Sequence, residues 1–155
     1  MAASTESAGS RQGTQSLSAS TVTSMPSRKK TIGISADFIP VLEAAMNTGL
    51  FAKELDVAKF AVAIAIRLSK PGSEMVNAQT KWNVGSFDDD GSLRRALQVL
   101  FPDCDDPVRK AEQLLHDGLE VLCESQTGTS VPDILRLVAA CGEPGPIAES
   151  AYRIA

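Results

Sequence analysis

The stretch from Asp56 to Ser69 constrains the fold more than any other part of the sequence. Apart from Lys59 and Arg67, every residue from 57 to 68 is apolar. Such a run fits a buried helix or a buried strand, and its length favours the helix because strands are usually shorter. It is also too short, and too charged near its ends, to span a bilayer. We therefore predict a central helix over 56–69 that its neighbours cover on nearly every face.

The rest of the pattern predicts further helices and two short strands around this central helix. Apolar residues recur at helical spacing in four other segments, and they alternate with polar residues in two short ones. We expect a mainly α-helical single domain of about five helices, whose strands pair with each other or with a second copy. The expected helices are 38–46, 56–69, 93–101, 108–122 and 133–140, and the expected strands are 31–35 and 81–85.

The chain divides by composition into a polar tail and a folded part. Residues 1–27 contain eight Ser and four Thr and almost no large apolar side chain, so we expect disorder there. Residues 28–155 form the expected domain, with 28–70 as a strand-helix-helix unit and 71–155 as an extended segment plus helices. Three widely spaced cysteines and no apolar secretory segment favour a reducing cytoplasm over an oxidising compartment.

Charge is spread unevenly along the chain. The first thirty residues carry four Lys and Arg against one Glu, whereas the remaining residues carry eleven Lys and Arg against eighteen Asp and Glu. An acidic body is a poor general partner for phosphate backbones, because affinity for them comes from Lys and Arg. The net negative charge of the folded part counts against nucleic acid as a partner but does not exclude a local basic face.

The sequence contains only weak signals for catalysis or metal binding. A calcium loop starting at Asp88 would need Glu at its twelfth position, where Val99 stands, so helix caps explain the acidic cluster better. His116, Glu120 and Cys123 share one helix face, but side chains from a single helix seldom build a nucleophilic site. We predict that the protein is not an enzyme and that it binds neither a cofactor nor a metal ion.

Residues 29–69 resemble the ribbon-helix-helix class of DNA-binding proteins. A Lys-Lys-Thr-Ile-Gly-Ile-Ser strand over 29–35, a helix, a turn and a second helix carry the resemblance. It implies that two chains pair their strands into a ribbon that enters the major groove of duplex DNA. The implied DNA-binding residues are Arg28, Lys29, Lys30, Thr31 and Gly33. Departures are a longer connector between the helices and two carboxylates, Glu54 and Asp56, where the family places a phosphate.

Two functions follow from these observations. The first is a non-catalytic accessory or adaptor protein that acts through protein–protein interaction in a larger complex, favoured by the acidic folded part. The alternative is a ribbon-helix-helix-like regulator that binds duplex DNA as a homodimer, favoured by the basic strand. Neither function calls for a membrane.

Overall fold

A computed structural model of the chain describes residues 28–126 and 132–142. The predicted disorder of 1–27 and the segment after 142 lie outside the described residues. The elements run in the order β1 (Thr31–Ile34), a 3-10 turn η1 (Ala36–Phe38), α1 (Ile39–Met46), α2 (Glu54–Arg67), β2 (Gln79–Asn83), α3 (Val84–Phe87), α4 (Ser92–Leu100), α5 (Pro107–Glu124) and α6 (Ile134–Gly142). The mainly α-helical single domain is therefore confirmed.

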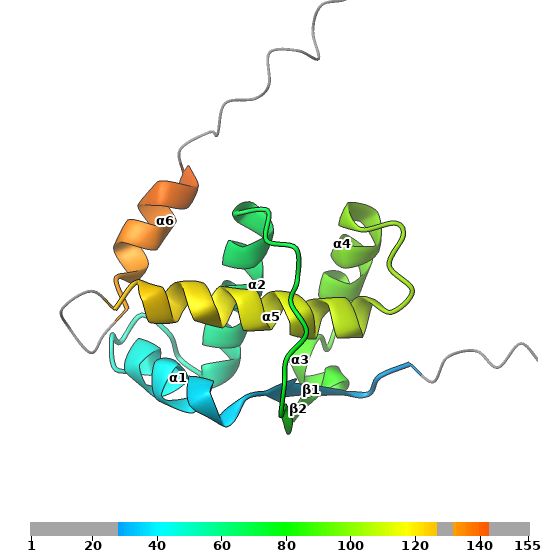
Figure 1. Ribbon diagram of the computed structural model, residues 1–155, viewed down its shortest axis with the longest axis horizontal. Coiled ribbons are helices and arrows are strands. Elements are labelled where there is room, and N and C mark those ends of the chain that lie inside the picture. The colour runs from blue at the N-terminus through cyan, green and yellow to red at the C-terminus, as the bar shows by residue number, and fades with distance from the viewer. Residues whose placement is uncertain (1–27, 127–131, 143–155) are drawn as a thin grey trace, which may run out of the picture.

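Helices α2 and α5 cross at the centre of the core (Figure 1). Gly118 of α5 lies directly against the backbone of Ala61 in α2, and both residues are buried. The absence of a side chain at Gly118 lets the two helix backbones approach closely. Buried leucines of α5 then pack beside this crossing, among them Leu114, Leu115 and Leu122.

The predicted central helix is confirmed, with a start and an end two residues earlier than expected. Its buried residues lie on one broad face: Val57, Ala58, Ala61, Val62, Ile64 and Ala65. Lys59 and Ala63 are exposed, so the expectation that neighbours cover nearly every face is wrong for that side. Most of the cover comes from α5, whose amphipathic apolar face is buried as its helical spacing predicted.

The two strands pair with each other in an antiparallel ladder, in which Ile32 lies opposite Trp82. Strand β2 begins and ends two residues earlier than expected, and residues 84–87 form one helical turn, α3, instead of continuing the strand. The turn brings Phe87 into the core, where its ring lies 5.7 Å from that of Trp82. Burial of this aromatic side chain outweighs the extended character of the local sequence.

Figure 1 shows α4 and the start of β1 near the N-terminal end of α5, and α6 at the opposite end of α5. Ile134 is the buried residue of α6, while Leu135 and Val138 are exposed. Among the helices of 28–126 and 132–142, none has the length and apolar character needed to cross a bilayer.

Candidate functional site

A basic groove of about 550 Å³ lies between the segment that precedes β1, the start of α4 and the N-terminal end of α5. Cationic side chains from two parts of the chain, more than sixty residues apart in sequence, meet there. The polar side chains that line it are five cations, one amide and one carboxylate: Arg28, Lys29, Lys30, Arg94, Arg95, Gln98 and Asp106. We refer to this feature as the cationic groove.

Residues 28–30 form the N-terminal wall of the groove, and two carboxylates, those of Asp106 and Glu112, fix this wall to α5. Asp106 caps α5, since its Oδ1 accepts the backbone N–H of Val108 at 2.9 Å. Its Oδ2 accepts the N–H of Lys29 at 3.2 Å. Glu112, only 7% exposed, accepts the N–H of Gly33 at 2.6 Å and forms an ion pair with the Lys29 ammonium. These contacts hold the basic segment against α5.

The opposite wall of the groove is the first turn of α4, which Asp88 positions. The buried Asp88 carboxylate accepts the N–H of Leu93 at 2.9 Å and the Arg94 Nε–H at 2.8 Å. Burial alone would raise the pKa of Asp88. Hydrogen bonds from the Arg94 side chain and from two backbone N–H groups lower it by a larger amount, so the net pKa lies below the ordinary value of 3.8. Asp88 therefore stays ionised at neutral pH and fixes Arg94 at the groove.

Three of the five cations in the groove keep their charge available. Lys29 is paired with Glu112 and Arg94 with Asp88. Arg28, Lys30 and Arg95 are exposed, and no carboxylate of the described residues lies within ion-pair distance of them. At longer range, Arg95 contributes, after the hydrogen bonds from Ser92, to lowering the pKa of Asp90. The groove is thus a local positive surface on an acidic chain.

The sequence-predicted DNA-binding residues divide between the groove and the interior. Arg28, Lys29 and Lys30 line the groove. Thr31 is half-buried, and Gly33 is buried beneath the Glu112 carboxylate, where an added Cβ would come within 3.0 Å of Oε1. Sequence reasoning missed Arg94, Arg95 and Gln98. The adjacent arginines at the start of a predicted helix were a signal, but only the tertiary fold places them opposite residues 28–30.

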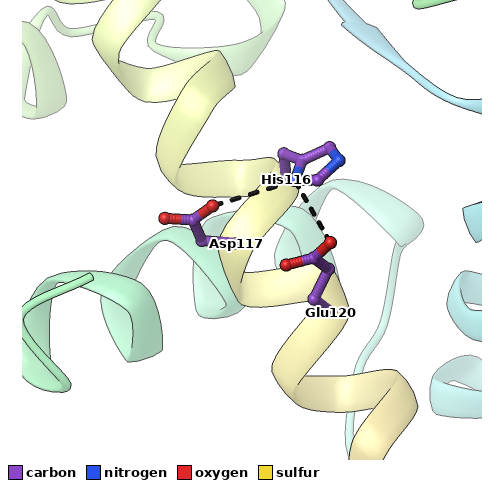
Figure 2. A group of neighbouring side chains, drawn as sticks. All are labelled: His116, Asp117 and Glu120. Carbon is purple, nitrogen blue, oxygen red and sulfur yellow. Dashed lines mark ion pairs between the residues drawn. The ribbon is translucent and has the colours of Figure 1, made fainter. Parts of the chain in front are cut away.

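A second group of titratable side chains lies in the middle of α5 (Figure 2). His116 Nδ1 lies 3.8 Å from Asp117 Oδ1 and 3.8 Å from Glu120 Oε1, too far for hydrogen bonds. One ligand atom from each residue lies within 4.8 Å of the others, so the three could approach a metal ion. Cys123, expected on the same face, is exposed.

The Asp117 carboxylate already has a structural role in the loop after α2. Its Oδ2 accepts the N–H of Gly72 at 2.8 Å and its Oδ1 accepts the N–H of Ser73 at 3.0 Å. Burial raises the pKa of Asp117, but the hydrogen bonds from Ser73 and Gly72 outweigh it, so the net pKa is lowered. The contacts of Asp117 explain its burial without a bound ion, so the cationic groove is the stronger candidate site.

Comparison of this chain with protein families, with characterised proteins and with solved structures found no match. The functional argument therefore rests on the groove itself.

Proposed function

We propose that this chain is a non-catalytic protein that binds duplex DNA through the cationic groove. The observation that carries the proposal is the gathering of Arg28, Lys30 and Arg95 on one surface, where no carboxylate of the described residues lies within ion-pair distance of them. Unpaired cations on a fixed framework suit phosphate oxygens, because their charge is not already neutralised within the protein. The duplex-DNA alternative drawn from residues 28–33 thus gains two arginines from α4.

The groove suits a duplex better than a single strand. Proteins that bind single strands usually stack bases on aromatic side chains. Of the described residues, no aromatic side chain lines this groove. Its donors are guanidinium and ammonium groups, which contact the phosphate backbone of a duplex from outside the base stack.

The test is a gel-shift titration with mixed-sequence duplex DNA at several salt concentrations. Three phosphate contacts predict a slope of about −3 in log K against log salt, at roughly −0.9 for each contact. The double variant Lys30→Ala and Arg95→Ala should weaken binding at least about tenfold and reduce the slope by about 2. Lys59→Ala is the matched control, since Lys59 is exposed on α2 and lies outside the groove.

Two results would overturn the proposal. One is the absence of duplex binding by folded wild-type protein at low salt. The other is an equal loss of affinity in the double variant and in Lys59→Ala, because binding would then depend on general charge and not on the groove.

The second candidate is the accessory or adaptor function, and α6 favours it. Leu135 is 71% exposed and Val138 is 49% exposed, and residues three apart share a helix face. Exposed apolar side chains that form such a face are found at protein–protein interfaces. Affinity purification from native extract should recover a stoichiometric protein partner with wild type and lose it with Leu135→Glu and Val138→Glu; recovery by both proteins would contradict a role for α6.

A further inference from the structure

The strand β1 offers little that could read a base edge. In a ribbon that enters the major groove, bases are contacted by side chains on one face of the strand. The residues on that face here are Lys29, Thr31 and Gly33. Lys29 is ion-paired with Glu112, Thr31 is half-buried, and Gly33 is buried and has no side chain. For direct base recognition this face therefore offers only the half-buried Thr31 hydroxyl and the ion-paired Lys29 ammonium.

The backbone of β1 is also already engaged within its own chain. Strand β2 pairs with β1 from Thr31 to Ile34. The N–H of Gly33 donates to Glu112 Oε1 at 2.6 Å. A second copy of β1 could add to this strand at Gly33 only by displacing the buried Glu112 carboxylate, which would lose its hydrogen bond and its ion pair with Lys29. Forming a two-chain ribbon would thus carry a cost that the single chain avoids.

The side chains still available in the groove are suited to phosphate. Arg28, Lys30 and Arg95 are long, exposed and cationic, and such side chains make mostly backbone contacts that carry no sequence information. Gln98, one turn further along α4, is the amide side chain that lines the groove. Gln can bind adenine in a bidentate manner and Arg can bind guanine, so Gln98, Arg28 and Arg95 are the groups whose base contacts the experiment must test.

We propose that the groove recognises the phosphate backbone of duplex DNA without reading its sequence, and that a single chain forms the complete site. This inference rests on the proposed DNA-binding function and specifies its ligand. Arg28, Lys30 and Arg95 contact phosphates from two walls of the groove, and Glu112 holds the N-terminal wall in place from behind. Gln98 contributes no base selection.

The experiment is a competition titration of full-length protein against a panel of unrelated duplexes of equal length, at one salt concentration. Their dissociation constants should agree within about threefold, whereas sequence-specific proteins discriminate by at least about a thousandfold. Gln98→Ala should likewise bind all the duplexes within about threefold of one another. Light scattering of the complex with a duplex short enough for one site should give one chain per duplex.

Each outcome of the experiment separates the inference from the function on which it rests. Preference for one duplex clearly beyond threefold overturns phosphate-only recognition but leaves DNA binding intact, and loss of that preference in Gln98→Ala would assign it to Gln98. Two chains per short duplex overturn the single-chain site. Absence of binding to every duplex overturns the proposed function itself.

Discussion

Replacement of Gly118 by Ala tests whether the α2–α5 crossing organises the core. In an exposed helix interior this change would stabilise the protein by up to about 1 kcal/mol, because Ala is the better helix former. Here an added Cβ would lie 2.9 Å from the Cα of Ala61 and closer still to its carbonyl group. Backbone atoms cannot rotate away as a flexible side chain can, so the two helices must separate.

The expected cost of Gly118→Ala follows from that separation. Overpacking a core typically costs about 1–3 kcal/mol and sometimes more. A gap of about 0.5–1 Å between α2 and α5 would also lose about a quarter to a half of the energy of each dispersion contact between them. We expect a net loss of about 3 kcal/mol, which lowers Tm by roughly 10–15 °C in a domain of this size.

Thermal and urea unfolding followed by circular dichroism measure this loss. Gly142→Ala is the control, because no atom of residues 28–126 or 132–142 lies within 4 Å of its added Cβ and its φ is ordinary. A Tm for Gly118→Ala that equals or exceeds that of wild type would refute the close crossing and with it the described core.

Three further changes probe the carboxylates that shape the groove and core. Asp106→Ala removes the cap of α5 and the acceptor for the Lys29 N–H, and should cost about 1–2 kcal/mol in urea unfolding. Glu112→Leu leaves a buried backbone N–H without an acceptor and should cost about 2–3 kcal/mol. The lowered pKa values of Asp88 and Asp117 mean that both carboxylates add stability above about pH 4, which is lost as pH falls through their folded-state pKa values. Asp88→Asn should therefore flatten the acid limb of Tm against pH.

An exposed neighbouring carboxylate supplies the control for Asp106→Ala. Asp105→Ala, at an exposed position next to the cap, should change the free energy of unfolding by less than about 0.5 kcal/mol. An equal cost at positions 105 and 106 would contradict the capping role. A Glu112→Leu protein as stable as wild type would contradict the buried anchor, and an unchanged acid limb in Asp88→Asn would contradict the lowered pKa.

The elements that the sequence predicted well carry their own local signals. Helix α5 has an Asp at its cap, Pro107 in its first turn and apolar residues at most of its buried positions, so its own sequence was enough to predict it. Turn α3 lacks such signals. Val84 and Gly85 do not form a helical pattern, and the turn follows from the burial of Phe87, which depends on residues distant in sequence.

The groove could not be predicted in full for a related reason. Residues 28–30 were recognised as a basic segment from their own charge. Arg94 and Arg95 follow three aspartates, so a local charge count conceals them. In the folded protein the buried Asp88 pairs with the Arg94 side chain and accepts the first N–H groups of α4, whereas no carboxylate of the described residues lies within ion-pair distance of Arg95. The sign of a surface depends on which charges the fold neutralises internally.

An acidic composition lowers the average affinity of a protein for nucleic acid, but it can also orient binding when several cations are concentrated in one groove. Beyond the first thirty residues, acidic side chains outnumber basic ones by eighteen to eleven, and Arg94 and Arg95 of the groove are among those eleven. For the proposed function, the net negative charge of the rest of the chain opposes general attraction of a duplex, while the groove attracts it. At a physiological Debye length of about 8 Å, the groove and the faces turned away from the duplex act separately. The charge asymmetry therefore favours one docking orientation, with residues 28–30 and the start of α4 toward the phosphates.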